Sequence, residues 1–508
     1  MIFPTSLALA TSTLLVNPAE ADSLNSQNGG VTLLEKNSTG FSGCRCFPGD
    51  TCWPALSEWA AFNQSLGGKL IATVPLASPC HDDPFAPFDA QLCTELQSTW
   101  FFPETHFDTS SSIMAPFFTN DSCNPFLPQD ASCTLGNFIS YAVNASDAKD
   151  FQKTVEFVQK NNIRLTIRNT GHDYNGKATG AGAVGIWTHN MKTMKIFDYS
   201  SLAYTGKAMR MGAGIQVVDA YQYAYDRGFV VVGGNCPTVG VAGGYTQGGG
   251  HSPLSSKFGM AADQALEWEV VTGTGEHLIA SPSQNADLYW ALSGGGGGTY
   301  GVVASLTVKA HPDLMTSAAN LTFTNVGISP DSFWNVVETF HESLPSIVDT
   351  GTVAVFVLTN ESFTVMPMQG PGVPKTHLQQ LLNATLTKLD QEKIQYCKLS
   401  APLNPCTADT DILGSAFNIG DFPTYYDSYK SFDPPWNVSQ YQIGGRLIPR
   451  SLVENNVSAL VQAERQIMGT GIGAIMSGVC LNVSGANTTM NSVNPEWRTA
   501  IFDAVIGT

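Results

Sequence analysis

The sequence has little charge and few basic residues. Only 13% of its 508 residues are charged, and 42 acidic against 25 basic residues give a formal net charge of −17. Nucleic acids and anionic membrane surfaces are recognised by basic patches, so neither is an expected partner. Outside the N-terminal stretch, no uncharged apolar run reaches the roughly 18 residues that a membrane-spanning helix requires. The sequence therefore predicts a soluble mature protein.

The motifs of several common enzyme classes are also missing. The chain contains no G-x-x-x-x-G-K-[S/T], no G-x-S-x-G and no H-E-x-x-H, so nucleotide hydrolysis on a P-loop and the commonest hydrolase mechanisms have no support. Residues 296–301 match G-x-G-x-x-G, but they follow an expected helix and precede an alternating strand. A Rossmann site needs a strand before the glycines and a helix after them, so this match is not interpreted as one.

The N-terminal third indicates export. Residues 1–21 are apolar and end in Ala19-Glu20-Ala21, which is typical of a signal-peptide cleavage site, although no Lys or Arg precedes Lys36. Eleven N-glycosylation sequons are spread along the chain. Seven of the eleven cysteines lie between Cys44 and Cys133, which predicts a disulfide framework. No metal site is expected, because paired C-x2-C spacings are absent.

Regular structure is expected to begin after an irregular, disulfide-stapled extension at 22–125. The spacing of apolar residues then predicts helices and strands at 146–160, 163–168, 218–225, 229–232, 266–270, 277–280, 286–292, 302–310, 329–340, 352–359, 379–388 and 445–448. Ser146 or Asn144 can cap the first helix, and Pro330 suits the first turn of the helix after Ser329. We place a domain boundary near Pro312, where the glycine-rich character ends.

Three glycine-rich loops are the strongest chemical signal. They lie at 169–176, 233–251 and 294–301, and the second contains eight glycines. Glycine lets the backbone approach a ligand closely, and consecutive N–H groups can then bind an anion such as a diphosphate. Simple turns would explain isolated glycines, whereas three dense loops favour a bound cofactor.

The residues in these loops resemble one enzyme family. The run Ile-Arg-Asn-Thr-Gly-His-Asp-Tyr from Ile167 to Tyr174 is similar to the R-x-x-G-H loop of the berberine bridge enzyme-like FAD oxidases, in the superfamily of vanillyl-alcohol oxidase (VAO) and p-cresol methylhydroxylase (PCMH). The run from Gly234 to Gly244 resembles the family's G-x-C-x-x-V-G-x-x-G segment, and 291–303 resembles its third glycine segment. The cysteine pattern at 44–54 is similar to that of the fungal secreted branch.

The resemblance implies a two-domain α+β protein. Residues 126–312 would form the PCMH-type FAD-binding domain, and 313–508 a substrate domain built on an antiparallel sheet covered by helices. His172 would bond the flavin 8α-methyl group and Cys236 its C6 atom, which would raise the reduction potential and retain FAD outside the cell. The ten cysteines other than Cys236 could then all pair. The residues expected to bind FAD are Arg168, Asn169, Thr170, Gly171, His172, Cys236, Gly240, Gly243, Gly244, Gly248, Gly249, His251 and Val303.

The implied reaction is hydride removal from a small organic substrate, such as an alcohol or a secondary-metabolite intermediate, with O2 as the acceptor and H2O2 as a product. The sequence does not identify the catalytic base. Tyr425, Tyr426 and Arg446 lie in the expected substrate domain, but a place in the core or on the surface explains them equally well. Members of the family usually continue past a segment like 494–498 into a tyrosine-asparagine stretch that packs on FAD. Two alternatives follow: the substrate domain is truncated in this sequence, or this member has lost part of its cofactor pocket and with it its activity. A dehydrogenase with another acceptor and an inactive secreted flavin-binding protein remain alternatives.

Overall fold

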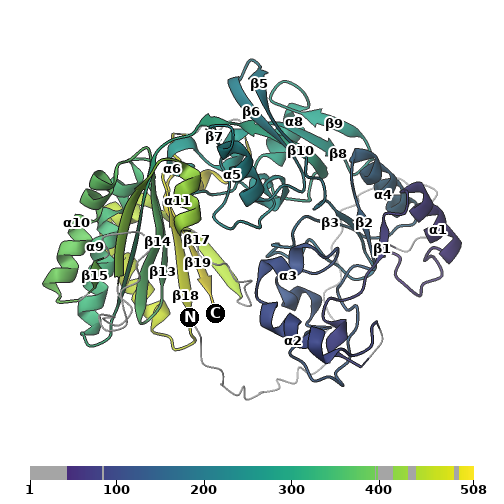
Figure 1. Ribbon diagram of the computed structural model, residues 1–508, viewed down its shortest axis with the longest axis horizontal. Coiled ribbons are helices and arrows are strands. Elements are labelled where there is room, and N and C mark those ends of the chain that lie inside the picture. Colours follow the sequence, from purple (N-terminus) through teal and green to yellow (C-terminus); the bar gives the residue numbers. More distant parts are fainter. Residues whose placement is uncertain (1–42, 83–84, 395, 399–415, 433–441, 486–490) are drawn as a thin grey trace, which may run out of the picture. The chain divides into compact units, whose positions relative to one another are not determined.

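Four β-sheets organise the part of the chain that the structure describes. This computed structural model describes residues 43–508 apart from 83–84, 395, 399–415, 433–441 and 486–490. Residues 45–508 form one compact unit (Figure 1). Among these residues, no helix is both long and apolar enough to cross a membrane.

The first sheet carries the first glycine loop. Its strand order is β1 (Leu70–Ala72), β2 (Tyr141–Asn144), β4 (Val184–Trp187) and β3 (Leu165–Arg168). β4 runs parallel to both β2 and β3, whereas β1 is antiparallel to β2. The predicted helix between β2 and β3 is α4 (Ala148–Lys160), but the predicted caps are wrong. Asp147 caps α4 by accepting hydrogen bonds from the backbone N–H groups of Lys149 and Asp150.

The extension before β2 is more regular than predicted. It contains α1 (Leu56–Ser65), β1, α2 (Ala90–Thr99) and α3 (Pro103–Phe107), so the expectation of an irregular segment is wrong. Trp59 and Phe62 of α1 are buried against Phe151 of α4, because two large aromatic side chains give this short helix an apolar face. The expected disulfides are confirmed for three pairs, Cys46–Cys52, Cys80–Cys93 and Cys123–Cys133.

The second sheet carries the third glycine loop and is antiparallel throughout. Its strand order is β5 (Met194–Ser200), β6 (Thr205–Gly212), β10 (Val302–Lys309), β8 (Ala265–Val271) and β9 (His277–Ala280). The elements predicted at 266–270 and 277–280 are β8 and β9, which pair as antiparallel neighbours. The central strand β10 is buried on both faces up to Val308, since α5 (Val217–Tyr225) and α8 (Ala286–Leu292) contribute to the core around it. A small sheet pairs β7 (Phe229–Val230) with β11 (His311–Pro312).

The third sheet has eight strands and belongs to the C-terminal half. Its order is β15 (Cys397–Lys398), β16 (Ala416–Phe422), β12 (Thr316–Thr324), β14 (Ser362–Pro371), β13 (Val353–Leu358), β18 (Ile475–Cys480), β19 (Ala500–Gly507) and β17 (Ile443–Pro449). Every neighbouring pair is antiparallel except β15–β16. This agrees with the antiparallel sheet that the resemblance implied.

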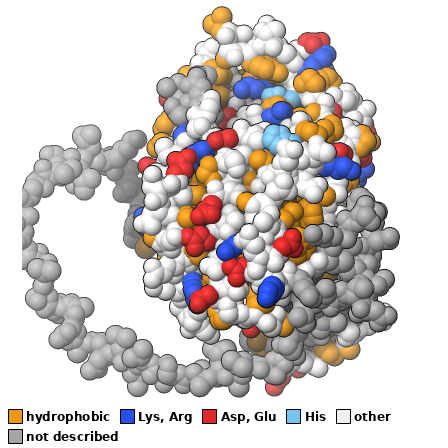
Figure 2. All heavy atoms as spheres, turned by 90° about the vertical axis from the view of Figure 1, so that its left-hand side faces the viewer, with side chains coloured by type: hydrophobic (Ala, Val, Ile, Leu, Met, Phe, Trp, Pro, Cys, Tyr) orange, Lys and Arg blue, Asp and Glu red, His pale blue; other side chains and the backbone are white. Residues whose placement is uncertain are grey.

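Helices cover one face of this sheet, as expected. α9 (Pro330–Val348), α10 (Lys375–Gln391) and α12 (Arg450–Met468) bury their apolar faces against it (Figure 1). Ser329 caps α9 and Pro330 occupies its first turn, as predicted. The side of the molecule that bears α9 and α10 shows acidic and basic side chains interspersed (Figure 2).

The core of this half contains a free thiol. Cys480 on β18 is fully buried, and burial raises its pKa well above the usual value of 9.0. The ten cysteines other than Cys236 could all have paired, but Cys480 forms no disulfide. Cys480 packs as a small apolar residue, which is a common role for buried cysteine.

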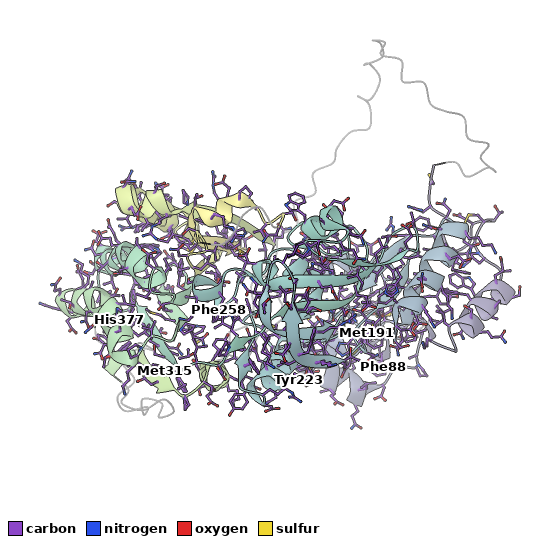
Figure 3. All side chains as sticks on the ribbon, turned by 90° about the horizontal axis from the view of Figure 1, so that it is seen from above. Phe88, Met191, Tyr223, Phe258, Met315 and His377 are labelled. Atoms are coloured by element: carbon purple, nitrogen blue, oxygen red, sulfur yellow. A yellow bond between two sulfur atoms is a disulfide. The ribbon has the colours of Figure 1, made fainter. Side chains whose placement is uncertain are left out.

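Two sets of contacts join the C-terminal half to the glycine loops. α11 (Tyr425–Phe432) packs on α5, and the Tyr429 hydroxyl donates to the Asn235 carbonyl at 2.8 Å. Arg498 forms a buried two-pronged ion pair with Asp263 of α7 (Ala261–Gln264), at 2.8 and 2.9 Å. Phe258, labelled in Figure 3, ends α6 (Ser255–Phe258), and its carbonyl accepts a hydrogen bond from Gln264 of α7 at 2.5 Å. The first contact reaches the second glycine loop at Asn235, and the second holds α7 to the C-terminal half.

Candidate functional site

One cavity of about 890 Å³ collects residues from all three glycine loops. This volume lies toward the upper end of the ~300–1,000 Å³ typical of small-molecule and cofactor sites. Of the thirteen predicted cofactor residues, eleven line it, namely Asn169, Thr170, Gly171, His172, Cys236, Gly240, Gly243, Gly244, Gly248, His251 and Val303. Strand ends thus bring together residues up to 134 positions apart in the sequence, from Asn169 to Val303.

His172 and Cys236 lie side by side in this cavity. The Cys236 sulfur is 3.8 Å from His172 Nε2, and Thr238 Oγ1 is 2.6 Å from the same nitrogen. Burial, with smaller contributions from the charges of His106 and Arg168, lowers the pKa of His172 from 6.5 to about 4. The imidazole is therefore neutral at neutral pH, which leaves a nitrogen lone pair available for bond formation.

Arg168 does not line the cavity but supports the loop from behind. Its guanidinium donates to the carbonyl oxygens of Ser112 at 2.8 Å, Thr109 at 2.5 Å, His106 at 2.8 Å and Thr170 at 3.3 Å. A Cβ added to Gly171 would lie 3.1 Å from this guanidinium. The structure thus corrects the expected direct contact with the cofactor: Arg168 ties the loop before His172 to the N-terminal extension.

Gly249 is the other predicted residue outside the cavity lining. Its φ of +114° is unfavourable for residues with a side chain, and an added Cβ would lie 3.6 Å from Val493. Gly249 therefore shapes the turn that precedes His251. Within the cavity, Gly240 packs against the Asn169 side chain, whose Nδ2 donates to the Ala213 carbonyl. An added Cβ at Gly297 would lie 2.7 Å from Gly244 Cα, so the second and third loops meet backbone to backbone.

The polar atoms of the cavity suit a polar, anionic cofactor. Asn169 Oδ1, Gln247 Oε1 and His251 Nδ1 are buried and make no hydrogen bond within the described part of the chain, so a ligand can satisfy them. Arg164 and Lys177 also line the cavity. The positive charges of Arg164 and Lys177, in a chain of net charge −17, are complementary to the negative diphosphate of FAD. The residues present therefore fit FAD.

Several cavity residues were not predicted as site residues. Lys177 donates to the Gly297 carbonyl at 2.6 Å and to Thr299 Oγ1 at 2.9 Å, and so connects the first loop to the third. Tyr174 lines the cavity, and burial together with the nearby Cys236 raises its pKa. The sequence gives no sign of the Lys177 contact because 120 residues separate it from Gly297. Gly296, Gly297 and Gly298 could have been included, since they belong to the third glycine segment.

The residues considered for catalysis in the C-terminal half lie elsewhere. Tyr425 is fully buried and its hydroxyl donates to that of Tyr221 at 3.3 Å, while Tyr426 is also buried. Arg446 is exposed on β17. None of the three lines the cavity, so they have structural or surface positions.

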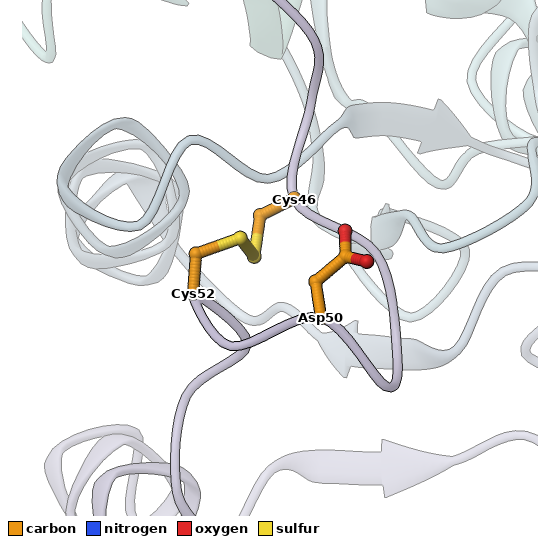
Figure 4. A group of neighbouring side chains, drawn as sticks. All are labelled: Cys46, Asp50 and Cys52. Carbon is orange, nitrogen blue, oxygen red and sulfur yellow. A yellow bond between two sulfur atoms is a disulfide. The ribbon is translucent and has the colours of Figure 1, made fainter. Parts of the chain in front are cut away.

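One cluster of potential metal ligands occurs in the described chain, at Cys46, Asp50 and Cys52 (Figure 4). Its two sulfur atoms form a disulfide, so neither is a thiolate ligand. Asp50 accepts a hydrogen bond from the Phe47 backbone N–H at 2.9 Å. This cluster closes a loop and is not a metal centre.

His106, behind the first loop, is expected to make stability depend on pH. Its ring nitrogens lie 2.6 Å from the Trp100 carbonyl and 2.8 Å from Ser112 Oγ, and burial lowers its pKa from 6.5 to about 4. Between pH 6.5 and about pH 4, the His106 side chain is protonated in the unfolded chain but not in the folded chain. Acidification should therefore lower the free energy of unfolding by up to about 1.4 kcal/mol per pH unit.

Urea unfolding at pH 7 and pH 5 tests this for the wild type and His106→Gln. The variant should lose less stability on acidification. Asp503→Asn is the control with the opposite expected effect. Burial raises the pKa of Asp503 to about 6, so its protonation on acidification favours the folded state, and the variant should lose more stability than the wild type. An equal loss in wild type and His106→Gln would contradict the prediction.

Comparisons with known proteins agree with this site. A family profile described as an FAD binding domain matches residues 139–281. The FAD-linked oxidoreductase sor8 of Hypocrea jecorina is 46% identical over 473 residues, which cover 93% of this chain and 78% of that protein. The VAO-type flavoprotein oxidase VAO615 of Thermothelomyces thermophilus is 40% identical over 477 residues, 92% of this chain and 80% of its own.

A solved structure extends the likeness to the fold. The crystal structure of the VAO-type flavoprotein MtVAO615 from Myceliophthora thermophila C1 superposes with a TM-score of 0.83 at 39% identity, covering 91% of this chain and 82% of that one. The resemblance inferred from the glycine loops is confirmed, and so is the fungal origin of the relatives. The chain belongs to the VAO-type FAD-linked oxidoreductases and is an FAD-dependent oxidoreductase with the two-domain PCMH-type α+β fold.

Proposed function

We propose that this protein is a secreted oxidase that holds FAD covalently through His172 and Cys236 and oxidises a small organic substrate, such as an alcohol or a secondary-metabolite intermediate. The observation that carries the proposal is the 3.8 Å approach of the Cys236 sulfur to His172 Nε2 inside the glycine-lined cavity. The two residues come from loops 64 positions apart. Such an approach suits bonds to the 8α and C6 positions, which both lie on the benzenoid ring of the flavin.

The residues around His172 and Cys236 favour a covalent bond to the flavin. His172 is neutral near pH 7 because burial lowers its pKa to about 4. With Nε2 occupied by Thr238, Nδ1 is the ring nitrogen left for the 8α bond. Backbone N–H groups of the glycine loops, together with Arg164 and Lys177, would hold the diphosphate.

When bound, FAD accepts a hydride from the substrate and passes the electrons to O2, which gives H2O2. The side chains of His251 and Gln247 would contact the ring system and exclude water from it, because both line the cavity and the atoms His251 Nδ1 and Gln247 Oε1 are buried. Support for O2 as the acceptor comes from the relative VAO615, which is named as an oxidase.

Secretion is proposed on two grounds. Disulfides persist in oxidising compartments, and three lie within residues 46–133. Asn120, Asn360, Asn383 and Asn456 are exposed sequon residues that an oligosaccharide could occupy. Recovery from the medium as a glycoprotein beginning near Asp22 is the expected result.

Acid precipitation of the purified protein tests the tether. A yellow pellet with flavin absorbance bands is expected, and a colourless pellet with all flavin in the supernatant would contradict covalent attachment. Peroxide release during turnover with a panel of alcohols, sugars and phenols tests the oxidase assignment. Turnover with an artificial acceptor but without peroxide would favour a dehydrogenase, and a flavin that no substrate in the panel reduces would favour an inactive flavin-binding protein.

A further inference from the structure

The hydroxyl group of Thr238 lies between the two side chains proposed to hold FAD. Thr238 Oγ1 is 2.6 Å from His172 Nε2 and 3.5 Å from Cys236 Sγ, and the residue is only 4% exposed. One buried hydroxyl group is therefore within hydrogen-bonding distance of both proposed attachment residues.

The backbone holds this hydroxyl group firmly in place. The Gln216 side chain donates to the Thr238 carbonyl at 3.2 Å, and the backbone N–H groups of Val217 and Val218 donate to the carbonyls of Val239 and Pro237 at 2.9 and 3.1 Å. These bonds tie the segment around Thr238 to the start of α5. A hydroxyl group fixed in this way can position a ring that approaches it from another loop.

The chemistry of the tether places two successive demands on His172 Nε2. Before attachment, Nδ1 must carry the lone pair, so the proton of the neutral ring resides on Nε2 and needs an acceptor. After attachment at Nδ1, the neutral ring has lost that proton, and Nε2 needs a donor. A hydroxyl group meets both demands because it can accept a hydrogen bond and also donate one. An aliphatic side chain of the same shape meets neither.

The attachment reactions balance with O2 as the oxidant. At His172, a C–H bond of the 8α-methyl group and the imidazole N–H are replaced by a C–N bond, and the two electrons and two protons reduce O2 to H2O2. At Cys236, the C6–H and S–H bonds are replaced by a C–S bond with the same reduction of O2. In both reactions the protein side chain loses one proton near Thr238.

We infer that Thr238 is a positioning residue for flavin attachment: its hydroxyl group accepts a hydrogen bond from His172 Nε2–H before attachment, donates one to Nε2 after it, and holds the ring beside Cys236. The inference rests on the proposed covalent attachment and assigns a residue that promotes it. Thr238 acts through His172.

The test uses Thr238→Val, which keeps the shape of the side chain, and Thr238→Ser, which keeps the hydroxyl group. The matched control is Thr73→Val, because Thr73 is buried and its hydroxyl group makes no hydrogen bond in the described structure. Each full-length protein is produced under riboflavin limitation and mixed with FAD. Total bound flavin and acid-precipitable flavin are then followed with time, and the peptides bearing His172 and Cys236 are weighed by mass spectrometry.

We expect Thr238→Val to bind FAD normally but to attach it about tenfold more slowly, the kinetic equivalent of losing one hydrogen bond. Thr238→Ser and Thr73→Val should attach it at the wild-type rate. If the valine variant does not fold, Thr238→Ala is expected to show the same slowing.

Two results would overturn the inference alone: attachment by Thr238→Val, or by its alanine substitute, at the wild-type rate, or attachment by Thr238→Ser as slow as that by Thr238→Val. A wild-type protein that releases all its flavin in acid would overturn the covalent attachment itself, and this inference with it.

Discussion

Replacing both His172 and Cys236 with alanine is expected to turn an acid-stable flavin into one that is fully released. The cavity keeps the three glycine loops and the cations Arg164 and Lys177, so the double variant should still bind FAD reversibly. Without either nucleophilic side chain, no covalent bond can form. The share of bound flavin that stays in the acid pellet, measured by the absorbance of the pellet and of the supernatant, should fall from nearly all to essentially none.

The single variants separate the two bonds. Cys236→Ala should stay yellow after precipitation, because His172 remains, but with a shifted absorbance spectrum and a lower reduction potential. An unchanged spectrum would show that the thioether does not form. Cys480→Ala is the control, since Cys480 is a buried thiol whose loss should leave attachment unaffected. Acid-stable flavin in the double variant would rule out His172 and Cys236 as the attachment sites.

Arg168→Met is expected to lower the free energy of unfolding by about 3–5 kcal/mol, because buried carbonyl groups lose their donor. The four carbonyl acceptors are those of His106, Thr109, Ser112 and Thr170. Methionine fills a similar volume but donates no hydrogen bond. The loop before His172 should also loosen, which would reduce flavin binding. Urea unfolding and flavin content measure the two effects.

Arg465→Met is the control for this substitution. Arg465 forms an exposed ion pair with Asp331 on the surface, and such pairs contribute about 0–1 kcal/mol. Equal stabilities of Arg168→Met and Arg465→Met would contradict the supporting role of Arg168.

The local sequence predicted much of the fold. Period-two and period-3.6 patterns located β8, β9, α8 and α9. In these segments the spacing of the apolar residues matches the face of the strand or helix that is buried. The prediction was wrong in the extension, where α1 is short and depends on packing of Trp59 and Phe62 against α4. It also missed Asp147 as the cap of α4, because three neighbouring polar residues were equally suitable.

The sequence by itself determined the kind of ligand and the loops that bind it. Glycine-rich segments containing His172 and Cys236 are readable without a structure, since glycine is required wherever backbone must approach a ligand. Only the tertiary structure decided what each side chain does there. It placed Arg168 behind the loop, Lys177 across to the third loop and Thr238 between His172 and Cys236. Most of these contacts join residues far apart along the chain, so they depend on how the sheets and loops pack and leave no local pattern.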